Sequence, residues 1–265
     1  MTDSEVTIAV LLPDLLGTYS DTGNATVLAQ RLRWRGIRAR VLPITATDSP
    51  PRDCDLYVIG GGEDTAQLAA GRWLLRHPHL TTTLLDRSVT LAVCAGLQLL
   101  GHAVTDLAGL SHPGLGVLDL TTRPGIERQI GEAVSRCRVP EVGTLTGFHN
   151  HRGVTVLGPA AQPLAETDRG PSNHPDSTAE GAVRASAPRS GLQPGIVATY
   201  LHGPVLARNP ALADHLLGRA LGMPLPDLDA ALLPDLPALR RTYLRGGSPV
   251  TSEHRTLRAR CSTRP

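Results

Sequence analysis

Cys94 stands where a thiol could act as a nucleophile. It follows the apolar run 89–93, which predicts a buried strand, and it precedes residues 95–101, which predict a helix. Open α/β sheets bind ligands beyond the carboxyl ends of their strands, and a helix N-terminus stabilises a thiolate. The small residues Ala95 and Gly96 let a substrate approach the backbone. An isolated cysteine is usually structural and buried, but this context favours a nucleophile.

His202 is the candidate base for such a nucleophile. It ends the apolar segment 195–201, so it is expected at the same edge of the sheet as Cys94. The base of a catalytic cysteine is commonly distant in sequence. A surface histidine is the alternative interpretation. Gly60–Gly62 follows another predicted strand, and such a turn can aim backbone N–H groups at an oxyanion. Its spacing does not match a dinucleotide-binding fingerprint.

Three further residues carry weaker signals. Arg128, in the segment 126–131, could hold a substrate carboxylate by two parallel hydrogen bonds, although a solvated arginine is the default. His149 and His151 form an H-x-H pair. A metal site would need a third ligand, which the sequence does not nominate, so we expect no metal.

Composition excludes several classes of function. The 265 residues are 41% hydrophobic with a net charge of +2, which favours a globular protein and gives no reason to expect a nucleic-acid binder. All 26 basic residues are arginine, so no lysine is available for a Schiff base or a Walker-type phosphate contact. The four cysteines form no C-x-x-C pair. Without a signal peptide or a long apolar run, we expect a cytoplasmic protein with reduced thiols.

The elements that must position these residues alternate between strand and helix. This alternation predicts an α/β domain with a mostly parallel sheet. The expected strands are 6–13, 38–42, 55–59, 89–93 and 195–201, and the expected helices are 25–36, 64–75, 95–101 and 210–221.

The other segments have different compositions. Residues 116–158 are rich in β-branched residues and glycine and predict antiparallel strands, whereas 166–190 has the composition of a mobile loop. Residues 224–245 predict a last helix interrupted by prolines. We therefore expect one domain over 1–245 and a disordered tail over 246–265.

Cys94–Gln98 also matches the C-x-G-x-Q nucleophile motif of class I glutamine amidotransferases. The chain resembles the cobyric-acid-synthase type of that family, and within it the glutaminase subunits of lipid II isoglutaminyl synthase. The matching segments, in this order, are 19–24, 59–62, 114–119, 128–131, 147–151 and 195–204, and they span roughly the first 220 residues.

The resemblance implies a flavodoxin-like glutaminase fold, with helices on both faces of the sheet, and hydrolysis of L-glutamine to glutamate and ammonia. The implied site comprises the nucleophile Cys94, the general base His202, the oxyanion-hole donors Gly61, Gly62 and Ala95, and the glutamine-binding residues Arg128 and Gln98.

The resemblance also implies a partner, a Mur-ligase-like synthetase subunit of the MurT type. That subunit would bind ATP and Mg²⁺ and use the ammonia to amidate the D-glutamate α-carboxylate of the peptidoglycan stem peptide, so this chain needs no cofactor. The lipid-linked acceptor would be reached through the partner at the inner face of the membrane, without insertion of this chain. Alternatives are a glutaminase for a corrinoid diamide synthase and an inactive binding subunit.

The sequence departs from the family pattern at three positions. Ala92 replaces a glycine two residues before the nucleophile, and His149 stands where we expect a glutamate. Pro204 occupies the place of the acid that many class I enzymes carry two residues after the histidine. We expect an acid from the partner to complete the triad. The alternative is an acid of this chain, with the candidates Asp14, Asp21 and Asp119.

Overall fold

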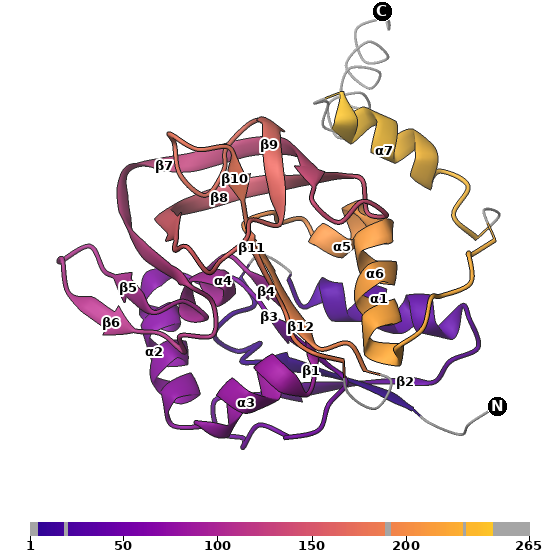
Figure 1. The fold of residues 1–265 in the computed structure, drawn as a ribbon, viewed down its shortest axis with the longest axis horizontal. Helices are drawn as coiled ribbons and strands as arrows, with labels where there is room; N and C mark the ends of the chain where they lie inside the picture. Colours follow the sequence, from indigo (N-terminus) through magenta and orange to yellow (C-terminus); the bar gives the residue numbers. More distant parts are fainter. Residues whose placement is uncertain (1–4, 19–20, 189–191, 230–231, 246–265) are drawn as a thin grey trace, which may run out of the picture. The chain divides into compact units, whose positions relative to one another are not determined.

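The computed structural model describes residues 5–18, 21–188, 192–229 and 232–245. A six-stranded sheet has the order β11-β12-β4-β3-β1-β2, in which only the pair β11–β12 is antiparallel (Figure 1). The strands are β1 (Val6–Leu11), β2 (Ala39–Ile44), β3 (Leu56–Ile59), β4 (Val89–Val93), β11 (Ala182–Ala185) and β12 (Gly195–Thr199). Every residue of β3, β4 and β12 is buried, as expected for apolar strands covered on both faces.

Six helices accompany this sheet. They are α1 (Gly23–Arg33), α2 (Asp64–Leu75), α3 (His79–Asp86), α4 (Ala95–Leu99), α5 (Val205–Arg208) and α6 (Pro210–Leu221). Helices α1, α5 and α6 pack on one another. The crossover through α1 and the crossover through α2 and α3 run in opposite directions along the sheet. Because such crossovers are right-handed, these helices cover opposite faces. The predicted parallel α/β architecture is confirmed.

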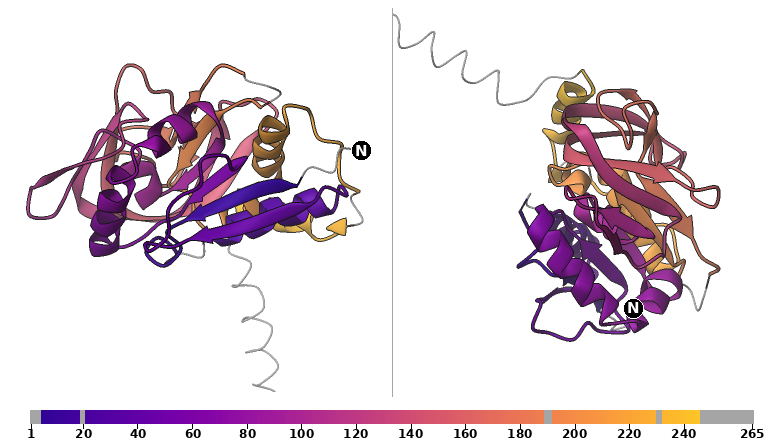
Figure 2. Two further views of the ribbon diagram at one scale, coloured as in Figure 1. Left: turned by 90° about the horizontal axis from the view of Figure 1, so that it is seen from below. Right: turned by 90° about the vertical axis from the view of Figure 1, so that its left-hand side faces the viewer.

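A second sheet has the order β10-β9-β7-β5-β6, and β8 pairs with β7. In the right-hand view of Figure 2 it occupies a different part of the molecule from the indigo and purple strands of the first sheet. Its strands are β5 (Ala103–Thr105), β6 (Ser111–Pro113), β7 (Leu120–Cys137), β8 (Thr144–Leu157), β9 (Ala165–Arg169) and β10 (Ala179–Glu180). The long β7–β8 hairpin confirms the antiparallel strands predicted over 116–158.

The prediction of a mobile loop over 166–190 is wrong for residues 166–188, and residues 189 and 190 lie outside the described part of the chain. Strands β9, β10 and β11 lie in or overlap this segment. The Asn173 side chain also bridges to the backbone of Gly181, accepting from its N–H at 2.7 Å and donating to its carbonyl at 2.8 Å. These contacts satisfy backbone groups that a polar loop would leave to water.

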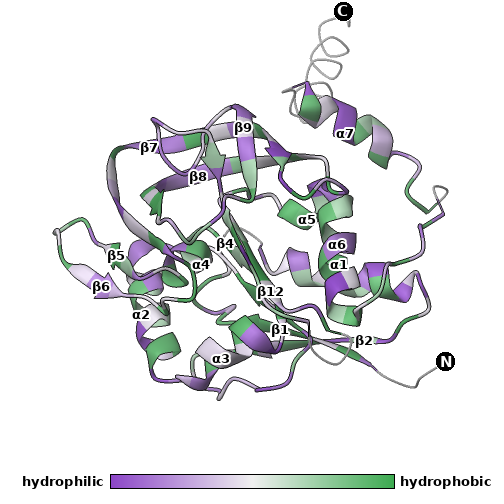
Figure 3. Ribbon diagram, viewed as in Figure 1, coloured by the Kyte–Doolittle hydropathy of each residue, from purple (hydrophilic) through white to green (hydrophobic). Residues whose placement is uncertain are grey.

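The core lies between the parallel sheet and its helices. Hydrophobic residues dominate β1, β4 and β12 in the hydropathy colouring of Figure 3. The largest fully buried side chains include Trp73, Tyr57 and Tyr200. This packing fixes the strand ends that carry the candidate site.

The chain divides into two compact units, residues 1–226 and 227–265. The second contains helix α7 (Leu236–Leu244), which has a proline in its first turn. The sequence-based boundary at 245 stays a prediction, and the expected tail over 246–265 falls outside the described residues. No helix in the described ranges combines the length and the apolar character that a membrane span requires.

Candidate active site

Cys94 occupies a sharp turn between β4 and α4. Its backbone has φ 52° and ψ −106°, a conformation that is strained for any residue with a side chain. Its N–H donates to the carbonyl of Thr199 at 2.9 Å, and the N–H of Gly96 donates to the carbonyl of Gly60 at 3.2 Å. These bonds tie the turn to β12 and to the glycine turn after β3. The predicted junction of strand and helix at Cys94 is present, and the structure adds that its backbone is strained.

Gly61 lies where three functional side chains converge. A Cβ atom at this position would stand 3.0 Å from His202 Cε1, 3.1 Å from Asp21 Oδ2 and 3.2 Å from Cys94 Cβ. The absence of a side chain at Gly61 therefore leaves the space in which these groups meet.

His202 follows the end of β12, and its backbone is held on both sides by Phe148. Its N–H donates to the Phe148 carbonyl at 2.9 Å, and the Phe148 N–H donates back at 3.3 Å. The ring nitrogen Nδ1 lies 3.3 Å from Oδ1 of the fully buried Asp21. Burial alone would lower the pKa of His202. Hydrogen bonds to Asp21 and Cys94, with the charges of both groups, outweigh burial and raise the pKa to about 10.

This geometry corrects the expectation that a partner supplies the acid. Asp21 of the same chain stands beside His202, 181 positions away in sequence. The other two candidates lie elsewhere: Asp14 accepts from the Ala46 N–H, and Asp119 accepts from the Ala160 N–H. The cysteine, histidine and aspartate therefore form a constellation within one chain.

The structure also corrects one predicted oxyanion donor. The N–H of Gly61 donates to Asp21 Oδ2 at 2.9 Å, so it is already engaged. Gly62 and Ala95 line the cavity beside Cys94. They remain candidates for that role.

Arg128 reaches the same cavity from β7. Its Nη1 donates to Asn150 Oδ1 at 2.6 Å, and its Nη2 lies 3.9 Å from Glu63 Oε2. All three residues line the cavity together with Cys94. The Arg128 side chain is 40% exposed, which leaves it accessible to a ligand.

Comparison with known proteins identifies the family to which this chain belongs. The model of the CobB/CobQ-like glutamine amidotransferase domain matches residues 7–210. The chain belongs to that family. The resemblance to glutamine amidotransferases of the cobyric-acid-synthase type is confirmed.

Relatives of this amidotransferase include subunit GatD of lipid II isoglutaminyl synthase (glutamine-hydrolyzing). The chain is 33% identical to GatD of Staphylococcus aureus (strain N315) over 219 residues, which are 82% of this chain and 84% of that one. It is 29% identical to GatD of Streptococcus pneumoniae over 82% of this chain and 81% of that one. A 30% identical match to the cobyric acid synthase of Limosilactobacillus reuteri covers 67% of this chain but 35% of the synthase.

The fold of this amidotransferase is shared with the glutaminase domain of Trypanosoma brucei CTPS, solved with bound acivicin. The TM-score is 0.51 at 13% identity, covering 84% of this chain and 96% of that domain. The class I glutamine amidotransferase fold expected from the sequence is therefore confirmed.

The side-chain amide of Gln98 in this amidotransferase is already hydrogen-bonded to other residues, so it is not free to bind a substrate. Its side chain lines the cavity, but its Nε2 donates to the Tyr200 hydroxyl at 2.9 Å and its Oε1 accepts from Gln67. Sequence reasoning missed Asn150 and Tyr200, which are far from Cys94 in the chain. Within the described residues, no three histidine, cysteine or acidic side chains are grouped to hold a metal ion.

Proposed function

We propose that this amidotransferase is the glutamine-hydrolysing subunit of a lipid II isoglutaminyl synthase. The convergence of Cys94, His202 and Asp21 about Gly61 carries the proposal, in a chain that is similar to GatD over most of its length. A subunit that had lost activity would have no reason to keep this constellation. The match to cobyric acid synthase covers only about a third of that enzyme, which favours the lipid II reaction over the corrinoid one.

In the proposed reaction the Cys94 thiolate attacks the side-chain amide carbon of glutamine. Backbone N–H groups of Gly62 and Ala95 stabilise the oxyanion. His202, kept protonated by Asp21, gives its proton to the leaving nitrogen, and ammonia departs as the γ-glutamyl thioester forms. His202 then takes one proton from water, which attacks the thioester. Glutamate leaves and its carboxyl group loses the second water proton to solvent, so that the Cys94 thiolate and the protonated His202 are restored.

Arg128 binds the α-carboxylate of glutamine in this scheme. Asn150 orients the guanidinium through their 2.6 Å hydrogen bond, so that its remaining donors face the cavity. Gln98 acts as a positioning residue, because its amide is held by Tyr200 and Gln67.

The ammonia is consumed by a Mur-ligase-like partner of the MurT type, which amidates the D-glutamate α-carboxylate. Activation of a carboxylate normally needs phosphoryl transfer, and this chain has no lysine for a P-loop contact. ATP and Mg²⁺ therefore belong to the partner in this proposal. The reaction takes place on the cytoplasmic side, where the partner meets its lipid-linked acceptor.

The test is a reconstituted amidation assay. The chain is purified with a Mur-ligase-like partner and supplied with lipid II, Mg-ATP and either glutamine or ammonium chloride. We expect amidated lipid II from both nitrogen sources, and Cys94→Ala should lose the glutamine-dependent reaction while keeping the ammonium-dependent one. Glutamine hydrolysis without any lipid II amidation would overturn the proposed acceptor.

A further inference from the structure

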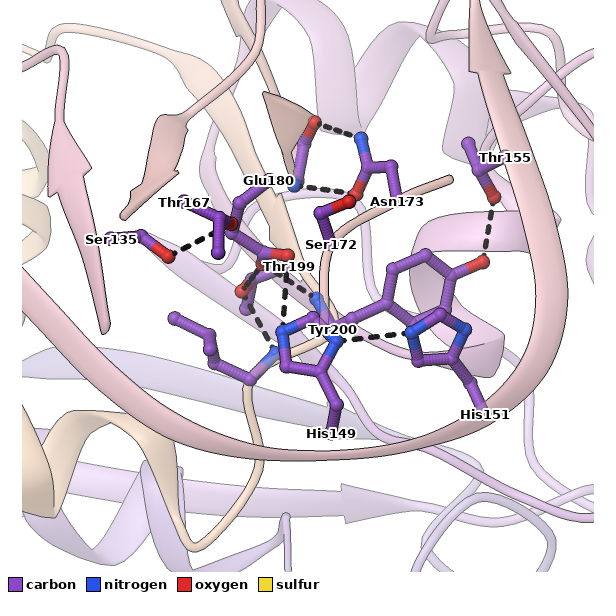
Figure 4. A network of polar contacts seen from close by, with 12 residues as sticks. Ser135, His149, His151, Thr155, Thr167, Ser172, Asn173, Glu180, Thr199 and Tyr200 are labelled. Carbon is purple, nitrogen blue, oxygen red and sulfur yellow. Dashed lines mark hydrogen bonds and ion pairs between the residues drawn. The ribbon is translucent and has the colours of Figure 1, made fainter. Parts of the chain in front are cut away.

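Figure 4 shows a second polar cluster, which contains His149 and Glu180. It adjoins the candidate triad, because His149 directly follows Phe148, whose backbone is bonded to that of His202. His149 Nε2 lies 3.3 Å from Glu180 Oε2, and both side chains are fully buried. On its other side His149 Nδ1 lies 3.0 Å from His151 Nε2, and His151 Nδ1 lies 2.8 Å from the carbonyl oxygen of Gly153. The ring of His151 stacks on Tyr200 with centroids 3.7 Å apart.

The hydrogens that this row of contacts requires can be counted. A carbonyl oxygen only accepts, so His151 Nδ1 carries a hydrogen. The contact between the two rings needs a second hydrogen. His149 Nε2 and Glu180 Oε2 are buried 3.3 Å apart, and neither atom has another hydrogen-bond partner among the described residues, so a Glu180 carboxylate there needs a third hydrogen, on His149. Two neutral imidazoles carry only two ring hydrogens. The row therefore holds one additional proton, because otherwise two buried acceptors would face each other at 3.3 Å.

The surroundings assign that proton to His149. Burial, and then the charge of His149, lower the pKa of His151 to about 3, so that ring stays neutral. Glu180 accepts hydrogen bonds from the Thr199 hydroxyl and, at 3.0 Å, from the Tyr200 N–H, as a carboxylate does. Although burial opposes ionisation of Glu180, His149 and these donors lower its pKa. A carboxylate at Glu180 leaves the third hydrogen of the row on His149 Nε2.

Both members of the pair belong to segments that hold His202. Glu180 accepts from the Thr199 hydroxyl and the Tyr200 N–H, three and two residues before His202 in the chain. His149 directly follows Phe148, whose backbone is bonded to His202 in both directions. The pair therefore fastens β8 to the end of β12 beside the proposed base.

We propose that His149 is a buried imidazolium and that the His149–Glu180 pair positions His202 against Asp21 and Cys94. The positioning role rests on the proposed glutaminase function, whereas the protonation of His149 does not. The pair also explains the histidine at position 149, where the sequence pattern led us to expect a glutamate. Glu180 supplies the carboxylate from the other side of the contact.

Nitrogen-15 NMR of histidine-labelled protein tests the proton directly. The ring signals of His149 and His151 are assigned with His149→Asn and His151→Asn variants. We expect three protonated ring nitrogens in these two residues at neutral pH, two of them in His149. Glu180→Gln should remove one, because its amide can donate to a neutral His149 while its oxygen still accepts from Thr199 and Tyr200. Only two protonated nitrogens in the wild-type protein would overturn the assignment.

Glutaminase kinetics test the positioning role. Glu180→Ala should lower kcat by about tenfold to a hundredfold with a smaller change in KM, since misplacing a catalytic group has this effect. Glu180→Gln should restore most of the loss. Glu166→Gln is the matched control, because Glu166 also accepts from a threonine hydroxyl but is paired with Arg138 away from the cavity. Its kcat should equal that of the wild type.

Two outcomes would contradict the positioning role. One is a folded Glu180→Ala protein with wild-type kcat, and the other is a Glu180→Gln protein as impaired as Glu180→Ala. Where Glu180→Ala gives no folded protein to assay, Glu180→Gln provides the test. A Glu180→Gln protein that folds like the wild type but has a strongly reduced kcat would also contradict the positioning role. Absence of glutamine hydrolysis by the wild-type protein, alone and with its partner, would instead remove the proposed function and leave the NMR result standing.

Discussion

At the scale of single residues, the site depends on how one aspartate uses its two oxygens. Asp21 Oδ1 faces His202 Nδ1, and Oδ2 accepts the N–H of Gly61. The carboxylate thus orients the imidazole and fixes the glycine turn beside the nucleophile. An imidazole held this way has a defined tautomer and a stabilised protonated form.

Replacing Asp21 by Asn tests this arrangement. Because the raised pKa of His202 depends on Asp21 as well as on Cys94, Asp21→Asn should move that pKa from about 10 toward the ordinary value of 6.5. NMR titration of the His202 ring measures the shift. The kcat for glutamine should fall by about a hundredfold to ten-thousandfold, as for an orienting acid in a triad. An unchanged titration and an unchanged kcat would show that Asp21 has no catalytic role.

Arg128 gives a separate prediction about binding. Loss of a charge-assisted contact to the substrate carboxylate costs ~1.5–3 kcal/mol, so Arg128→Ala should lower kcat/KM about tenfold to a hundredfold, chiefly through KM. Arg128→Lys should restore only part, because the planar fork is lost. Arg136→Ala is the control, since Arg136 lies on the same strand but pairs with Asp168 on the surface. Equal KM values for both alanine variants would show that Arg128 does not bind the substrate and is an ordinary surface arginine.

At the scale of elements, the bounds of helices and strands were predicted most accurately where the local pattern of apolar residues matches their burial. The bounds of α2, β4 and α6 coincide with the predicted ones, and the Cys94 turn lies where the strand–helix junction placed it. Their apolar periodicity reports directly which face is buried.

Other features depend on contacts that no local pattern shows. Strands β9 to β11 are short segments stabilised by pairing with one another and with β7 and β12, and by Asn173. Asp21 could not be distinguished from Asp14 or Asp119, because only the folded chain brings it to His202. The sequence also could not show that the N–H of Gly61 donates to Asp21.

The close packing of helix α4 against strand β3 at Gly96 gives a prediction at the scale of elements. A Cβ at Gly96 would lie 2.8 Å from the Ile59 carbonyl oxygen and 2.9 Å from Ile59 Cγ2. Gly96→Ala should therefore push the Cys94 turn away from β3 and destabilise the protein by about 1–3 kcal/mol, measured by urea unfolding. Gly71→Ala is the comparison, since Gly71 also lies in a helix, and a Cβ there would meet only the end of the Leu99 side chain, at 3.1 Å. A smaller loss for Gly96→Ala than for Gly71→Ala would contradict the close approach.

At the scale of the whole molecule, we propose a division of labour between two proteins. In this proposal the chain makes ammonia, and its partner activates the acceptor carboxylate. Calorimetric titration of the isolated chain with Mg-ATP should therefore show no binding heat, while the complex with its partner should bind the nucleotide. The chain has no P-loop motif and no lysine to hold the phosphates. Stoichiometric micromolar binding of Mg-ATP to the isolated chain would contradict this division.

Covalent labelling shows whether Cys94 is the nucleophile of a glutaminase. Burial raises the thiol pKa of Cys54 and Cys137, so these cysteines should react poorly. The chain is incubated with a glutamine analogue that carries an electrophilic γ-carbon, and the adduct is mapped by mass spectrometry. We predict one adduct per chain, on Cys94, with activity lost in proportion, and none in Cys94→Ala. Loss of activity with the label on another cysteine, or a Cys94→Ala protein that still hydrolyses glutamine, would contradict the account.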